Sequence, residues 1–210
     1  MKKNDILNIL HDKIQTVVIS AVNDQLSAVS TIIDLIIENE KIYFILAKGD
    51  ELFSALEKNQ LLYLNGYNQV GTFKQVITMS VKIREIDQDQ TNELIGNNDT
   101  ILQLYKNSKA LNILHGYEIY EYDGEYTDFS QDPVQRGFFS SQQLFTAKAF
   151  QVTGQCIYCK ACYRVCPQKC IDITKKPAEI NIYHCLQCGK CADICPRHAI
   201  TKTKVQLSAI

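Results

Sequence analysis

The last third of the chain carries two copies of one cysteine pattern, and thiols at this spacing are ligands for iron. Each copy places four cysteines as C-x2-C-x2-C-x3-C and follows the fourth with proline. The runs begin at Cys156 and Cys185 and hold eight of the nine cysteines. Three thiolates at steps of three residues can converge on three corners of a four-iron cube, and the fourth corner needs a ligand from elsewhere. The pattern therefore predicts two 4Fe–4S clusters and one-electron transfer.

Each cluster is expected to take its fourth ligand from the other run, as is usual for this spacing. The ligands of the first cluster are then Cys156, Cys159, Cys162 and Cys195. Those of the second are Cys185, Cys188, Cys191 and Cys166. Because each half contributes to both clusters, cluster loading and folding should be coupled.

Two other uses of cysteine fit this pattern poorly. Zinc sites usually combine two separated C-x2-C pairs, often with histidine, and disulfide frameworks need an oxidising compartment. The start of the chain, MKKNDILNIL, does not look like an export signal. No segment approaches the roughly eighteen apolar residues of a membrane span. A reducing, cytoplasmic location without a membrane partner is expected.

The two runs are also the halves of an internal repeat. Residues 156–171 align with residues 185–200 at an offset of 29, and six of sixteen positions agree. This duplication strongly resembles the small two-cluster ferredoxins, and the resemblance implies a ferredoxin domain over residues 150–210. Between the runs, residues 171–183 alternate apolar and polar around a Lys-Lys-Pro sequence, which predicts a hairpin.

Cys170 breaks the repeat, because the second half has Ala199 at the equivalent position. One interpretation is a spare ligand or a redox-active thiol. The other is a small packing residue, which free cysteine often is, and the ferredoxin resemblance favours this one.

Length and charge indicate a second domain before the cysteines. A ferredoxin needs about sixty of the 210 residues. Residues 148–210 hold ten Lys/Arg and three Asp/Glu, a formal charge of +7, whereas residues 1–147 hold twelve and twenty, a formal charge of −8. Opposite charges favour attraction between the domains or steering of an acidic redox partner. Nucleic-acid binding is not expected, since the lysines are scattered around the cluster loops.

The elements of this first part are predicted from hydrophobic periodicity. Helices are expected at 5–12, 50–59 and 91–107, strands at 16–22, 27–37, 41–47, 61–67 and 71–87, and a hairpin-like β run at 115–129. About six strands with helices between them favour a small antiparallel barrel over a parallel sheet.

This order of elements, with the segment KIYFILAKGDELFSALEKNQLLYLNGY at 41–67, resembles the pyridoxamine 5′-phosphate oxidase-like split barrels. In that family a strand ending in A-K-G precedes a helix that ends in L-x-x-N-P, and here Gln60 stands where the proline often is. The resemblance implies a mainly β split barrel over residues 1–130, joined to the α+β ferredoxin domain. Residues 128–143 resemble the linker of barrel–ferredoxin fusions, so a linker is expected over 131–149.

Such barrels usually form homodimers and bind FMN at the dimer interface. The resemblance implies that Lys48 lies at the FMN phosphate and that Ser30 and Thr31 lie on the strand of the first contact. Two features depart from the family: residues 14–40 contain no arginine or lysine, and Asp50 adds a negative charge near the expected phosphate. Alternatively, Lys48 and Asp50 form a turn and a helix N-cap, and the barrel binds another ligand or none.

The sequence thus predicts an iron–sulfur electron-transfer protein, a flavin-linked oxidoreductase in which FMN and two clusters exchange electrons with a partner protein. The alternative is a non-enzymatic ferredoxin-type carrier whose barrel serves for dimerisation and docking. A redox sensor that responds to cluster loss is a third interpretation. No catalytic residue is identified.

Overall fold

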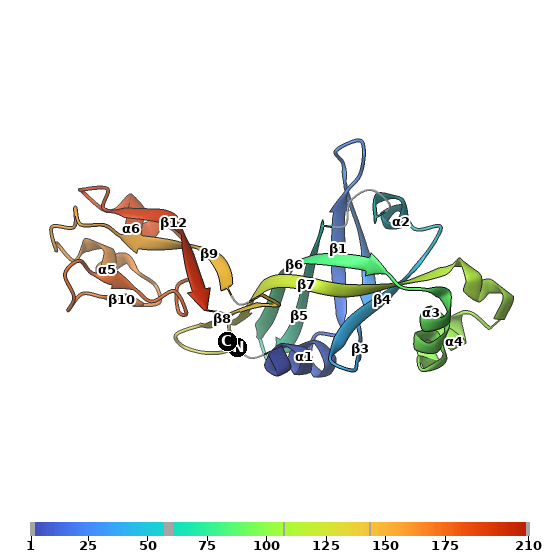
Figure 1. Ribbon diagram of the computed structural model, residues 1–210. Coiled ribbons are helices and arrows are strands. Elements are labelled where there is room, and N and C mark those ends of the chain that lie inside the picture. Colours follow the sequence, from blue (N-terminus) through green and yellow to red (C-terminus); the bar gives the residue numbers. More distant parts are fainter. Residues whose placement is uncertain (1–2, 57–60, 107, 143, 209–210) are drawn as a thin grey trace.

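The computed structural model describes residues 3–56, 61–106, 108–142 and 144–208. Figure 1 shows two bodies, a β-rich N-terminal half and a smaller cysteine-rich half, which meet near β8 and β9. None of the helices in these described ranges is both long and apolar enough to cross a membrane. The fold is mainly β, as the sequence predicts.

The N-terminal half is one antiparallel sheet with short helices around it. The strands are β1 (Thr16–Val22), β2 (Ala28–Asp34), β3 (Ile36–Glu38), β4 (Lys41–Ala47), β5 (Leu61–Val70), β6 (Phe73–Glu85), β7 (Leu114–Asp128) and β8 (Gln135–Ser140). The helices are α1 (Lys3–Asp12), α2 (Glu51–Leu56), α3 (Gln88–Gly96), α4 (Asp99–Leu104) and the 3-10 helix η1 (Ser108–Ile113). The spatial order is β2-β1-β5-β6-β7-β4-β3, and β8 pairs with β7.

Alternating hydrophobicity closes this sheet around its core. Along β1 every second side chain is buried, as are Leu62 and Leu64 in the first half of β5, because successive residues of a strand point to opposite faces. Ile19, Leu64 and Met79 are at most 1% exposed and lie in one cluster with the apolar side of α1. The sheet therefore curls around a continuous apolar core, as in a half-closed barrel.

The long strand β7 corrects the expected hairpin-like run at 115–129. It is a single strand of 15 residues that pairs with β6 on one side and, along its first and second halves, with β4 and β8 on the other. Gly124 does not form a turn here. A Cβ atom at this position would lie 2.4 Å from the Phe139 ring and 2.7 Å from the Thr78 carbonyl oxygen, so the glycine lets three strands pack closely.

The helical prediction for 91–107 is also corrected in its bounds. The structure has two helices there, α3 and α4, each with its own N-cap. The side chains of Asp87 and Asn98 accept hydrogen bonds from the backbone N–H of Gln90 and Ile101. The second cap ends the first helix near Asn97, and residue 107 lies outside the described residues.

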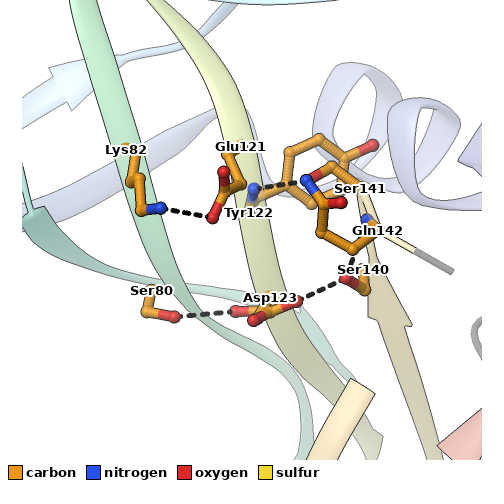
Figure 2. Close-up of polar contacts among 8 residues, drawn as sticks. All are labelled: Ser80, Lys82, Glu121, Tyr122, Asp123, Ser140, Ser141 and Gln142. Carbon is orange, nitrogen blue, oxygen red and sulfur yellow. Dashed lines mark hydrogen bonds and ion pairs between the residues drawn. The ribbon is translucent and has the colours of Figure 1, made fainter. Parts of the chain in front are cut away.

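Residues 131–149, expected as a linker, contain β8 and the first part of β9 (Leu144–Val152). Figure 2 shows how the end of β8 is held: Ser140 bonds to Asp123, and the Tyr122 N–H donates to the Ser141 hydroxyl at 2.9 Å. The Ser141 N–H in turn donates to the Tyr122 carbonyl oxygen at 2.8 Å. Nearby, Lys82 and Glu121 form an ion pair of 2.7 Å between β6 and β7. The chain thus leaves the barrel from a fixed point.

The cysteine-rich half is built on one long ladder. Strand β9 pairs antiparallel with β12 (Ile200–Ser208) over nine residues, from Leu144↔Ser208 to Val152↔Ile200. Two short helices, α5 (Ala161–Val165) and α6 (Lys190–Asp193), lie within the two cysteine runs. The expected hairpin is present: β10 (Ile171–Asp172) pairs with β11 (Glu179–Ile180).

Candidate functional site

The first cysteine site is a cavity beside the end of β9. Four thiols line it, those of Cys156, Cys159, Cys162 and Cys195. Apolar side chains make up much of the rest of its wall: Val152, Ile157, Ile173, Ala178, Ala199 and Ile200. The structure therefore brings together the four residues that the sequence assigns to the first cluster.

The second site is a similar cavity on the other side of the repeat. It is lined by Cys166, Cys185, Cys188 and Cys191, the four residues assigned to the second cluster. Phe150, Ile171 and Ile180 contribute apolar surface. Four thiols in an apolar wall form the donor set that a 4Fe–4S cluster requires, so the chemistry of both cavities fits that cofactor.

The backbone of the two ligand loops follows the same repeat. Tyr158, Lys160 and Lys169 have left-handed φ values of 61°, 60° and 49°. Their equivalents 29 residues later, Gln187, Gly189 and His198, have φ values of 54°, 81° and 47°. Non-glycine residues in this region cost of order 1 kcal/mol each. The same left-handed conformations recur at matching positions of the two loops. This indicates that the need to turn successive cysteines inward determines the shape of both loops.

Backbone amides also point at the thiols. The Gln187 N–H donates to Cys185 Sγ at 3.4 Å, and the Ala199 N–H donates to Cys195 Sγ at 3.3 Å. Such hydrogen bonds stabilise a thiolate ligand and help to set the potential of a cluster. By contrast, burial raises the pKa of the Cys191 thiol to about 11. Cluster assembly must therefore displace protons from the cavities.

Cys170 lies among the ligands of the second cavity. Its sulfur is 3.6 Å from that of Cys166 and lines the same cavity. Hydrogen bonding with Cys185 raises the pKa of the Cys170 thiol and lowers that of Cys185. Cys170 is half-buried beside Ile171 in the small apolar cluster of this half, so it packs there as a fifth thiol.

The barrel has a cavity of its own, of about 330 Å³, between α2 and the adjoining ends of β4, β6 and β7. It is lined by Lys48, Phe53, Leu56, Ile83, Arg84, Glu85, His115 and Tyr117. Its polar groups are partly paired: His115 Nδ1 is 2.7 Å from Glu85 Oε1, and Arg84 donates to Glu118 Oε2 at 2.7 and 2.9 Å. Two aromatic rings, those of Phe53 and His115, lie 4.7 Å apart at its wall. The cavity thus combines the cationic side chains of Lys48 and Arg84 with the flat aromatic surfaces of Phe53 and His115.

Of the predicted flavin-binding residues, only Lys48 lines this cavity. Ser30 and Thr31 lie on β2, opposite Ser20 and Ile19 of β1, and are not part of its wall. The Asp50 carboxylate accepts a hydrogen bond from the Leu52 N–H at 2.8 Å, so it caps α2. Arg84 and His115 were missed from the sequence because they meet Lys48 only through strand pairing.

The comparisons with known proteins divide the chain in the same way. Residues 155–200 match a family model described as "4Fe-4S dicluster domain". No curated protein matches the sequence. The structure is similar to that of a NimC/NimA family protein from Clostridium acetobutylicum, with 15% identity and a TM-score of 0.52 over 66% of this chain and 91% of that chain.

Two further solved structures are similar to this one over more than half of the chain. One is a protein of the pyridoxinephosphate oxidase family from Clostridium acetobutylicum, with 10% identity and a TM-score of 0.49 over 66% of this chain and 94% of that chain. The other is a heme-binding protein from Mycobacterium smegmatis, with 4% identity and a TM-score of 0.48 over 59% and 54%. The N-terminal half has the split-barrel fold, and the C-terminal half contains a 4Fe–4S dicluster domain.

Proposed function

We propose that this chain is a flavin-linked oxidoreductase. Its split β-barrel leads into the 4Fe–4S dicluster domain, and in this proposal FMN bound by the barrel exchanges electrons with the two clusters. The dicluster domain itself supports iron–sulfur electron transfer. The observation that carries the proposal is the pair of four-cysteine cavities. A flavin exchanges electrons in pairs and each cluster takes one, so two clusters match one flavin.

The two cavities lie close enough to work as a pair. Helix α5 connects them, because Cys162 near its start lines the first cavity and Cys166 after its end lines the second. Four residues of helix rise about 6 Å. An electron that reaches one cluster is therefore a short distance from the other.

For the flavin we propose the cavity that contains Lys48. Lys48, Arg84 and His115 would hold its phosphate, in place of the expected Ser30 and Thr31, and the rings of Phe53 and Tyr117 offer apolar surface. Arg84 is 57% exposed and already paired with Glu118, which leaves Lys48 as the central cation of this proposal.

A second candidate function is the electron carrier without flavin, and the length of β7 favours it. His115 lines the barrel cavity, whereas Glu125 lies where β7 pairs with β8, next to the cysteine-rich half. Ten residues of strand span about 34 Å, and electron tunnelling falls off steeply with distance. In this alternative the barrel serves for docking and dimerisation.

We also propose that the protein is a homodimer through the barrel and acts in the cytoplasm. The outer face of β2, β1 and β5 exposes apolar side chains side by side: Ile32 is 70% exposed, Val18 41% and Tyr63 57%. A second copy of the chain would cover this face. Reducing conditions in the cytoplasm keep thiols available for cluster assembly.

Anaerobic purification tests the proposal. We expect about eight irons per chain, and free flavin in the supernatant after acid precipitation, near one per chain. A colourless supernatant with eight irons would select the electron carrier. Loss of flavin in Lys48→Gln, with iron unchanged, would assign the flavin to the proposed cavity; retention would reject that cavity.

A further inference from the structure

The chain at the start of β8 binds the cysteine-rich half through two residues, Val134 and Arg136. The Val134 N–H donates to the side-chain oxygen of Gln168 at 2.8 Å, and the Val134 carbonyl oxygen is 2.8 Å from His184 Nδ1. The Arg136 N–H donates to the Tyr183 carbonyl oxygen at 2.8 Å. These bonds attach a barrel strand to the segments on both sides of the second cavity, just after Cys166 and just before Cys185.

The Arg136 side chain continues this contact into the protein interior. It is only 4% exposed. One terminal nitrogen donates to the carbonyl oxygens of Cys185 (2.9 Å) and Ile182 (3.2 Å), and the other donates to Glu125 Oε2 on β7 at 2.6 Å. The guanidinium carbon lies 5.0 Å from the centre of the Phe138 ring. A buried cation whose two terminal nitrogens are both hydrogen-bonded thus connects the barrel sheet with a ligand residue of the second cavity.

The charges of Arg136 and its acidic partner do not cancel fully, so the pair contributes a net positive potential at the second cavity. Glu125 is its acidic partner, but the Glu125 side chain is 36% exposed, so water screens its charge more than that of the buried guanidinium. A cluster with four thiolates is anionic and becomes more so when it is reduced. A positive charge held nearby in a poorly solvated place stabilises the reduced form.

We propose that Arg136 is a positioning residue that fixes the Cys185 loop against the barrel and makes the second cluster easier to reduce than it would be without this cation. The second cluster then lies on the side of the dicluster domain that is next to the barrel. The first cluster, farther along β9, faces the external partner. This inference rests on the two clusters of the proposed function and does not require the flavin.

A potentiometric titration followed by EPR tests this assignment. In Arg136→Gln we expect one of the two midpoint potentials to fall, with about a tenfold change in the reduction equilibrium, which is about 59 mV for one electron. The other potential should stay unchanged. Arg136→Lys should restore part of the shift, because it keeps the charge without the two-sided geometry. Glu125→Gln should move the same potential upward.

Assignment of the shifted signal uses Cys195→Ser, which should remove the signal of the first cluster and leave the sensitive one. Arg164→Gln is the matched control, since it also removes one positive charge, but at an exposed position in the cysteine-rich half. Equal shifts of both potentials, no shift with eight irons retained, or a shift confined to the first cluster would overturn the inference. A purified protein without iron–sulfur signals would instead overturn the proposed function.

Discussion

Cys166 and Cys195 occupy equivalent places in the two halves, and each lines the cavity of the opposite run. We therefore expect Cys195→Ser to damage the first cluster and Cys166→Ser the second, each with loss of up to about half of the eight irons. Iron analysis and EPR of the purified variants measure this.

Cys170→Ser is the matched control for these two variants, because its thiol lies beside the second cavity as an extra group. It should retain all the iron. Damage to the same cluster in both ligand variants would contradict the crossed arrangement.

At the scale of single residues, the sequence predicted which thiols line the same cavity, but it did not predict which residues line the barrel cavity. Each cysteine run is local, so spacing alone determines which side chains converge. Arg84 and His115 lie 31 residues apart in the chain and meet through the register of β6 with β7. No local pattern marks such a pair.

Among the elements, the strands with strict alternation were predicted best. The predicted bounds of β1 and β4 agree with the structure, since a half-buried strand shows its period directly in the sequence. β7 was not predicted as one strand, because an Asp-Gly pair in an alternating run is typical of a tight turn. The packing of Gly124 against Phe139 is a tertiary constraint that only the folded sheet reveals.

Helix α2 offers an element-scale test of the role of Asp50. Asp50→Ala should lower the free energy of unfolding by about 1 kcal/mol, because the Leu52 N–H loses its cap. Asp50→Asn should unfold like the unmodified protein, since asparagine caps as well as aspartate. Denaturant unfolding followed by circular dichroism measures both. Equal losses in the two variants would show that the charge, and not the cap, stabilises this turn.

The two halves of the molecule are stabilised by different means. The barrel has an extended apolar core, whereas the cysteine-rich half has only a few buried apolar residues, such as Ile171 and Ile200, beside its thiols. A domain of this size needs an additional cross-link, such as a disulfide or a metal site, to be stable. Clusters that take ligands from both halves of the repeat provide one.

Removal of iron should consequently unfold one half only. After chelation under reducing conditions, we expect residues 144–208 to become sensitive to protease while a fragment ending near Ser140 resists it, because metal binding is coupled to the folding of such domains. Mass spectrometry of the fragments, with the cluster-loaded protein as control, measures this. Unchanged resistance of the cysteine-rich half would refute the coupling.

The whole molecule also presents the apolar face of β2, β1 and β5, and the proposed homodimer depends on it. Ile32 is 70% exposed and lies opposite Val18 in the register of β1 and β2. Ile32→Lys would place a charge in the proposed interface, where an unpaired buried charge is strongly unfavourable. We expect this variant to be a monomer in light scattering at concentrations where the unmodified protein is a dimer.

Leu104→Lys, at a 74% exposed leucine of α4 away from this face, should leave the dimer intact. A dimer that persists in Ile32→Lys but dissociates in Leu104→Lys would move the interface to the helical side of the barrel.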